Sequence, residues 1–259
     1  MPRFAANLSM MFTEVPFLDR FAAAAQAGFK AVEFLFPYDF PAAEIAARLK
    51  DNGLQQVLFN APPGDWTRGE RGMAALPGRQ QEFRDAIRKA LDYCATLSCP
   101  RLHVMAGLAP QGVPHDTLTA VYGANLAWAA DEAHKAGVKP VIEPINHRDI
   151  PGFFLNTTDQ AAAIINAVGP DKVGMQFDLY HCQITEGDIV KRVEKHLPLI
   201  AHMQVADNPG RHEPGTGEVN WPFVFDRIDA LGFRGWIGCE YRPANETVAG
   251  LGWFKPYRA

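Results

Sequence analysis

Four oxygen-bearing side chains stand at the ends of short apolar runs, and their spacing suggests that they meet in one site. They are Glu143, Asp178, Gln204 and Glu240, separated by 35, 26 and 36 residues. Each interval is about one strand, one helix and two loops, so a parallel barrel would carry all four to the same end. Oxygen ligands suit Mg²⁺ or Mn²⁺ better than Zn²⁺, and three converging carboxylates without a cation would repel each other. The pattern therefore predicts a divalent metal or a proton-transfer pair, unless one or two of these residues are salt-bridged groups on the barrel rim.

Polar residues close to these positions are candidates for binding substrate. His181 follows Asp178 by three residues, so its imidazole could overhang the metal site and donate to a substrate oxygen, or it could cap the next helix. Asn146 could line the same pocket or make turn hydrogen bonds. Three residues at earlier strand ends could line the opposite wall: Asn7, Glu33 and Asn60. Five histidines have no partner pattern and are expected to be structural: His103, His115, His134, His196 and His202.

Two loops are longer than a simple connection requires, and loops of that length in compact domains are usually functional. Loop 207–221 is rich in glycine and contains Arg211, whose guanidinium could bind a carboxylate through two hydrogen bonds or could be solvated. Loop 60–79 contains Trp66 and could close over a small substrate, which would exclude water. Both loops follow predicted strands, at the end where such barrels carry their active sites.

The elements that must position these residues alternate regularly between β-rich and helical segments. The eight predicted strands are 4–6, 31–36, 55–59, 101–106, 139–143, 173–178, 201–205 and 236–240. The predicted helices between them are 16–27, 41–52, 80–97, 115–136, 158–168, 187–196 and 222–231. Strict alternation implies a parallel sheet, and eight repeats favour closure. The prediction is an α/β protein with a single (β/α)8 TIM-barrel domain spanning residues 1–259.

Composition limits the partners and the location of the chain. The net charge is −4 and the pI about 6.1, without a run rich in Lys or Arg, so a nucleic-acid partner is disfavoured. No apolar run approaches the ~18 residues needed to span a bilayer, and a cytoplasmic location is expected. The four cysteines form no C-x-x-C pair and are expected to be buried thiols. Aromatic residues after Thr247 could pack on the barrel or on a second subunit, which makes a homodimer an open alternative.

Short segments along the whole chain carry a resemblance to a known family, and they are residues 4–10, 28–29, 33–38, 64–66, 69–72, 77–79, 143–147, 151–153, 204–209, 213–218 and 235–241. In these segments the chain resembles the hydroxypyruvate isomerase family, within the wider xylose-isomerase-like barrel superfamily. The resemblance implies a metal-assisted aldose–ketose isomerisation of a small hydroxy-oxo acid through an enediolate. It also implies that Glu143 and Glu240 transfer the proton and that these two, with Asp178 and Gln204, bind the metal. Epimerases of the superfamily commonly have His where this chain has Gln204.

The resemblance implies two close activities and leaves the choice between them open. The first interconverts hydroxypyruvate and tartronate semialdehyde. The alternative interconverts 2-oxo-tetronate and 3-oxo-tetronate, which is the same chemistry with one more carbon. A ketose 3-epimerase, an endonuclease-IV-like repair enzyme and a non-catalytic binding protein are further alternatives on the same fold.

Overall fold

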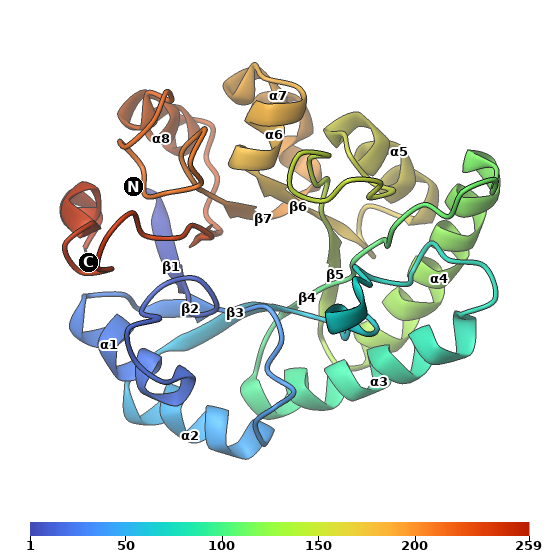
Figure 1. Cartoon of the computed structure of the whole chain (residues 1–259), viewed down its shortest axis with the longest axis horizontal. Helices are drawn as coiled ribbons and strands as arrows, with labels where there is room; N and C mark the ends of the chain where they lie inside the picture. Colours follow the sequence, from blue (N-terminus) through green and yellow to red (C-terminus); the bar gives the residue numbers. More distant parts are fainter. Residues whose placement is uncertain (259) are drawn as a thin grey trace.

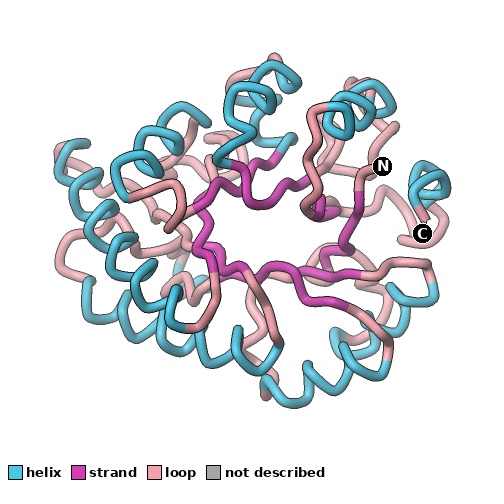
Figure 2. The backbone as a smooth tube through the Cα atoms, turned by 180° about the vertical axis from the view of Figure 1, so that it is seen from behind, coloured by secondary structure: helices cyan, strands magenta, loops and turns pink. Residues whose placement is uncertain are grey.

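The computed structural model describes residues 1–258, in which eight parallel strands close into one barrel. The strands are β1 (Arg3–Asn7), β2 (Ala31–Glu33), β3 (Gln55–Asn60), β4 (Arg101–His103), β5 (Lys139–Ile142), β6 (Gly174–Asp178), β7 (Ile200–Gln204) and β8 (Trp236–Cys239). Neighbours pair in chain order, and β8 pairs with β1, so no strand edge is left open. The strands form an inner ring with the helices outside it (Figure 2). The predicted (β/α)8 TIM barrel is confirmed.

The helices surround the barrel (Figure 1). They are α1 (Arg20–Gln26), α2 (Ala42–Asp51), α3 (Gln80–Leu97), α4 (His115–Lys135), α5 (Thr158–Val168), α6 (Leu179–Thr185), α7 (Ile189–His196) and α8 (Trp221–Ala230). In α3 the buried residues include Phe83, Ile87, Ala90 and Cys94, which recur at the spacing of one helical face. That periodicity explains why the long helices are predictable from the sequence.

Two details of the predicted elements are wrong. Strands β2 and β4 end at Glu33 and His103, each three residues before the predicted end. The sequence also predicts one helix between β6 and β7, whereas the structure has two, α6 and α7. Helix α6 begins directly after Asp178, whose side chain caps it by accepting a hydrogen bond from the backbone N–H of Tyr180 at 2.8 Å. Asp178, one of the candidate metal ligands, is therefore held in place by the first turn of α6.

The aromatic tail, a 3₁₀ helix at Leu251–Tyr257, packs on this chain's own barrel. The ring of Phe254 stacks on that of Phe29 with centroids 4.3 Å apart, and Trp253 lies edge-on to Phe4 at 5.0 Å. The tail therefore packs on the barrel, the first of the two predicted alternatives, and a homodimer stays a prediction. All four cysteines are free and buried, as predicted.

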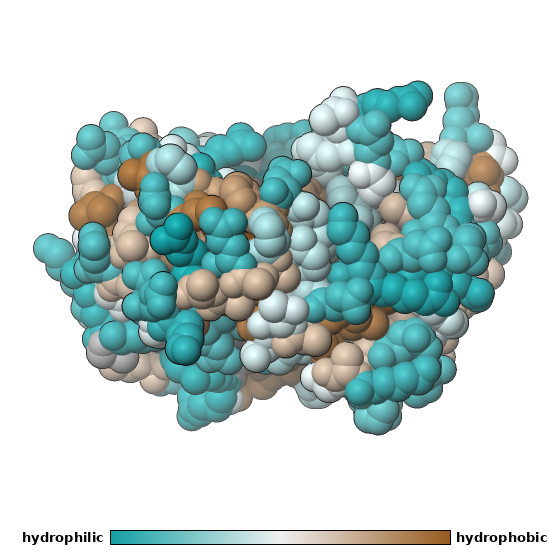
Figure 3. Space-filling model, turned by 90° about the horizontal axis from the view of Figure 1, so that it is seen from below, coloured by the Kyte–Doolittle hydropathy of each residue, from teal (hydrophilic) through white to brown (hydrophobic). Residues whose placement is uncertain are grey.

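The outer surface is largely hydrophilic on the face shown in Figure 3, where apolar residues are scattered among polar ones. Among the helices in residues 1–258, none combines the length and the apolarity that crossing a bilayer would require.

Candidate active site

Three carboxylates and one imidazole converge at the C-terminal end of the barrel. Glu143 directly follows β5, Asp178 ends β6, and Glu240 directly follows β8. One ligand atom from each of these residues, and one from His181 in α6, lie within 4.8 Å of one another. All four side chains are buried. The spacing seen in the sequence therefore does bring the three predicted carboxylates into one site.

Gln204 ends β7 beside Asp178, with which it is paired in register. Its amide is held in a buried chain of hydrogen bonds: Oε1 accepts from Nε2 of Gln176 at 2.6 Å, and Nε2 donates to Oε1 of Glu33 at 2.9 Å. Glu33 also pairs with His202 Nε2 at 2.6 Å. Gln204 is thus fixed at the rim of the cluster, and its predicted role as a metal ligand stays a prediction.

Glu33 and Gly238 fit together inside the barrel. A Cβ at position 238 would lie 2.2 Å from the carboxylate of Glu33, so only glycine leaves room for this buried side chain. The predicted position of Glu33 on the opposite wall is therefore not what the structure has. Glu33 does not border the cavity and lies in the polar network with Gln204; Nδ2 of Asn7 joins it to Glu240 on the cavity wall by donating to Oε1 of Glu33 at 3.0 Å and to Oε1 of Glu240 at 3.5 Å.

The donor set fits a divalent cation. Within residues 1–258, Oε1 of Glu143 and Oδ2 of Asp178 are buried acceptors with no hydrogen-bond partner. A buried oxygen without a partner is costly, and two of them beside a third carboxylate form an all-oxygen concavity typical of sites for Mg²⁺ or Mn²⁺. Nε2 of His181 lies close to both, 3.5 Å from Oδ2 of Asp178 and 3.8 Å from Oε1 of Glu143.

The hydrogen bonds around His181 define which of its nitrogens carries the proton. Oδ1 of Asn146 accepts from the backbone N–H of Asp149 at 2.8 Å, which orients the Asn146 amide. The amide nitrogen of Asn146 therefore faces Nδ1 of His181 and donates to it at 2.5 Å. A neutral imidazole whose Nδ1 accepts must carry its proton on Nε2. His181 thus presents an N–H group toward the carboxylates, which makes it a donor in preference to a metal ligand.

Burial shifts the pKa values of these groups toward their neutral forms. It lowers the pKa of His181 well below its usual value, helped by the positive charge of Arg211. It raises the pKa of Glu143 well above its usual value, helped by the negative charges of Glu240 and Asp178. Burial also raises the pKa of Asp178 to about 6 and that of Glu240 to about 8, in both cases against the opposing effect of Arg211. Without a cation, the cluster cannot hold all its carboxylates ionised near neutral pH.

Arg211 is the main counter-charge to the cluster. Its Nη2 lies 2.6 Å from Oε2 of Glu240, and its Nη1 lies 3.0 Å from Oδ2 of Asp149. Its guanidinium also lies over the ring of Tyr180, 4.9 Å from the centroid. The predicted use of Arg211, gripping a substrate carboxylate, therefore competes with two ion pairs that it already makes.

The loop that carries Arg211 is built around Asp207. The carboxylate of Asp207 accepts backbone hydrogen bonds from Asn208 at 2.9 Å, Gly215 at 2.8 Å and Gly217 at 2.9 Å. A Cβ at Gly217 would lie 1.8 Å from the carbonyl oxygen of Asn208, so this close turn requires glycine. Arg211 thus projects from a rigid loop into the site.

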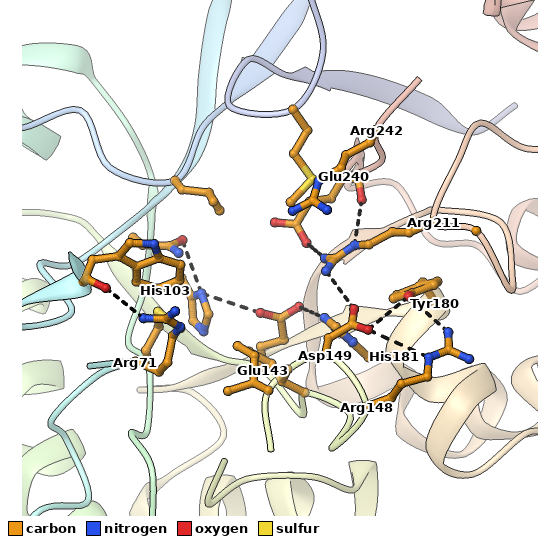
Figure 4. A pocket seen from close by; sticks show the side chains of 18 of the residues that line it. Arg71, His103, Glu143, Arg148, Asp149, Tyr180, His181, Arg211, Glu240 and Arg242 are labelled. Carbon is orange, nitrogen blue, oxygen red and sulfur yellow. Dashed lines mark hydrogen bonds and ion pairs between the residues drawn. The ribbon is translucent and has the colours of Figure 1, made fainter. Parts of the chain in front are cut away.

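A cavity of about 530 Å³ opens above the cluster and has the size of a small-molecule site. Figure 4 shows its lining, in which Glu143, His181, Arg211 and Glu240 point inward. Trp66 lies on its rim and is 39% exposed. Asp178, Asn146 and Gln204 are not among the residues that border the cavity.

Several cavity residues escaped the sequence reasoning. His103 was expected to be structural, but it lines the cavity with Nδ1 3.7 Å from Oε2 of Glu143, and burial lowers its pKa to about 3. Asp149 and Tyr180 border it as well. Asp149 and Tyr180 could have been found from the sequence only by their position, since Asp149 follows Asn146 by three residues and Tyr180 follows Asp178 by two.

Comparison with known proteins defines the class first. Residues 21–257 match the family model described as "Xylose isomerase-like TIM barrel". The chain is 49% identical, with a TM-score of 0.98 and complete coverage of both chains, to a crystal structure described as AP endonuclease, family 2, from Brucella melitensis.

Curated relatives narrow the family. The chain is 57% identical to the 2-oxo-tetronate isomerase of Cupriavidus necator, covering 99% of each protein. It is 45% identical to the hydroxypyruvate isomerase of Escherichia coli, covering 100% of each. The chain therefore belongs to the xylose isomerase-like TIM barrel family, and within it to the hydroxypyruvate and 2-oxo-tetronate isomerases.

Proposed function

We propose that the protein is an aldose–ketose isomerase acting on a small hydroxy-oxo acid. The observation that carries the proposal is the buried convergence of Glu143, Asp178, His181 and Glu240 within 4.8 Å under a small-molecule cavity. The names of the 57% and 45% identical relatives support the same class of substrate. Hydroxypyruvate was the first candidate from the sequence. The higher identity to the relative named 2-oxo-tetronate isomerase now favours the four-carbon acid.

The reaction moves protons within one molecule and needs no external oxidant. A base removes the proton from the carbon that bears the hydroxyl, and an enediolate forms across the two carbons. A proton then returns to the carbon that was the carbonyl, while the hydroxyl proton passes to the other oxygen. We assign the first transfer to Glu143 and the second to Glu240, whose ligand atoms lie on the same small cluster.

When bound, Mg²⁺ or Mn²⁺ held by Glu143, Asp178, Glu240 and Gln204 would polarise the carbonyl and stabilise the charge that develops on the substrate oxygens. His181 donates its Nε2–H to one of those oxygens, and Asn146 keeps the imidazole in the tautomer that can do so. Arg211 holds Glu240 and faces the substrate from the cavity wall. Trp66, on the rim, covers the bound acid and limits access of water.

The proposal is tested by incubating the protein and Mg²⁺ or Mn²⁺ with each acid and following the isomer by NMR. Loss of a positioned base costs about 10²–10⁴-fold, so Glu143→Gln and Glu240→Gln should each lower kcat by at least that range. Glu44→Gln, an exposed change on α2, is the matched control and should leave kcat unaltered. A glutamine variant that keeps more than about a tenth of the activity has no part in proton transfer.

A DNA-repair activity is the second candidate, because the similar Brucella structure is named as an AP endonuclease. The described site argues for the isomerase, since its cluster holds three carboxylates and one imidazole, and His181 is oriented as a donor. Cleavage of an abasic-site oligonucleotide by this protein would reverse that choice. A cytoplasmic location, action as one domain over residues 1–259, the lack of a nucleic-acid partner and a homodimer all stay predictions.

A further inference from the structure

Four arginines line the cavity, and they differ in whether a carboxylate of the protein already pairs with their guanidinium group. They are Arg71, Arg148, Arg211 and Arg242. Arg211 is paired with Glu240 and Asp149, and Arg148 lies 3.9 Å from Asp149. An acid substrate brings one more negative charge into a site that already holds several carboxylates. It therefore needs a cation that is not yet neutralised.

Arg71 meets this requirement. Within residues 1–258, no carboxylate oxygen lies within 4.0 Å of its guanidinium nitrogens. Only Nη1 makes hydrogen bonds, to the backbone carbonyls of Trp66 at 3.1 Å and Glu70 at 2.8 Å. Nε and Nη2, the pair of donors that matches the two oxygens of a carboxylate, have no partner among the described residues.

The position of Arg71 is fixed before any ligand arrives. Its guanidinium stacks 3.8 Å above the ring of Trp66, and that ring packs on Phe36 with centroids 5.0 Å apart. The next residue, Gly72, pairs with Ala106 just beyond β4, so the chain is anchored to the barrel at this point. Arg242 also lacks a carboxylate partner, but it is exposed and makes no side-chain hydrogen bond within residues 1–258. A pre-positioned arginine loses less entropy on binding than a free one.

We propose that Arg71, stacked on Trp66, binds the carboxylate of the substrate through its Nε–Nη2 edge. The inference rests on the proposed isomerase function, and it names the recognition element of that site. Figure 4 shows Arg71 on one side of the cavity and Arg211 with Glu240 on the other, with Glu143 between them. The carboxylate end of the acid would lie against Arg71, while its carbonyl and hydroxyl oxygens lie against the carboxylate cluster. The span between the two then selects the length of the acid.

The test compares Arg71→Met and Arg71→Lys with Arg242→Met, which removes the same charge from the same cavity. KM and kcat are measured with both acids. Calorimetry with glycerate, a carboxylate without the reactive carbonyl, measures binding apart from turnover. Loss of a charged bidentate contact predicts a rise of about 10- to 100-fold in KM and in the glycerate Kd for Arg71→Met, with kcat at saturation nearly unchanged. Arg71→Lys should lie between, and Arg242→Met should change either constant by less than about fivefold.

The outcomes separate this inference from the proposed function. If the wild type turns over an acid but Arg71→Met, shown by circular dichroism to be folded, keeps its KM and glycerate Kd, the role of Arg71 is overturned and the isomerase stands. An equal loss in Arg242→Met, or no measurable glycerate binding by the wild type, also overturns it. If neither acid is turned over but glycerate binding is lost only in the Arg71 variants, the isomerase fails and the carboxylate site is supported.

Discussion

Replacing Arg211 by methionine should destabilise the protein by an amount that a divalent cation restores. Arg211 is the counter-charge to Glu240, and the two side chains are only 17% and 5% exposed. Breaking a buried ion pair by removing one partner costs about 3–5 kcal/mol, because the other charge is left buried and unpaired. The contact with Asp149 adds little, since that carboxylate is 22% exposed. We expect a loss of about 3 kcal/mol in unfolding free energy, the lower end of this range, because the ion pair borders a cavity and is not fully enclosed by protein.

The penalty should appear as the pH rises. Burial raises the pKa of Glu240 from 4.5 to about 8 even with Arg211 present. A carboxyl group with a raised folded-state pKa favours the folded state in its neutral form. That stabilisation is complete below the unfolded pKa and is lost as the pH rises through the folded one. Because Glu240 is largely neutral below its folded-state pKa of about 8, the variant should be close to the wild type near pH 5 and should fall increasingly below it as the pH rises through 8.

The assay is urea or thermal unfolding of both proteins in EDTA, and then with Mg²⁺ or Mn²⁺. For a chain of this size about 3 kcal/mol corresponds to a fall in Tm of about 6–12 °C. A cation at 100 times its Kd stabilises the folded state by about 2.7 kcal/mol, and it should raise the Tm of the variant more than that of the wild type. Arg211→Lys keeps the charge and is the matched control. Equal Tm values for Arg211→Met and the wild type in EDTA at pH 9, above the folded-state pKa of Glu240, would refute the reasoning.

Three further predictions concern the loops around the cavity. Asp207→Asn places an amide NH₂ group against backbone N–H groups from which the carboxylate accepts hydrogen bonds. The protein should therefore lose about 2–4 kcal/mol of unfolding free energy and much of its kcat. An unaltered urea midpoint and an unaltered kcat would show that other contacts hold the loop in place. Hydrogen bonds from Arg79 and from the backbone N–H of Asp65 lower the pKa of Glu70 in the folded protein. These contacts therefore stabilise the loop fully at a pH above the pKa that Glu70 has in the unfolded chain. The stabilisation is lost as the pH falls through the pKa that Glu70 has in the folded protein. Hydrogen exchange of the Asp65 amide, which donates to Glu70 at 2.6 Å, should lose protection once the pH falls below the usual range of a glutamate pKa, and constant protection there would contradict the role of Glu70. Trp66→Ala should raise KM by removing the stacking partner of Arg71 and should lower kcat by exposing the bound acid to water, and full turnover by this variant would exclude the covering role of the ring.

The barrel and the carboxylate cluster were predictable because both depend on local patterns. Strands buried on both faces are almost continuously apolar, so a charged residue directly after such a run, as at Glu143 and Glu240, is visible in the sequence. Regular spacing then places these residues on one rim. Helix α6 was not predictable in the same way, because its seven residues are too few to show a helical period and its start depends on the cap at Asp178.

The orientation of the site depends on contacts between segments far apart in the sequence. The tautomer of His181 is set by a hydrogen bond from Asn146, 35 residues earlier in the chain. Arg211 forms an ion pair with Glu240, 29 residues later. The free edge of Arg71 becomes visible only in three dimensions, where its described hydrogen bonds go through Nη1 to the backbone carbonyls of Trp66 and Glu70. Residue type and spacing carry none of this information, since it follows from packing in three dimensions.

Proton NMR in D₂O tests the central claim most directly. Metal-free protein is mixed with hydroxypyruvate or 2-oxo-tetronate, and Mg²⁺ or Mn²⁺ is then added. The account predicts deuterium incorporation at the carbon beside the carbonyl and formation of the isomer, both dependent on the metal and both lost in Glu143→Gln. Absence of exchange with either acid under either metal, or equal exchange in Glu143→Gln, would contradict an enediolate isomerase built on this carboxylate cluster.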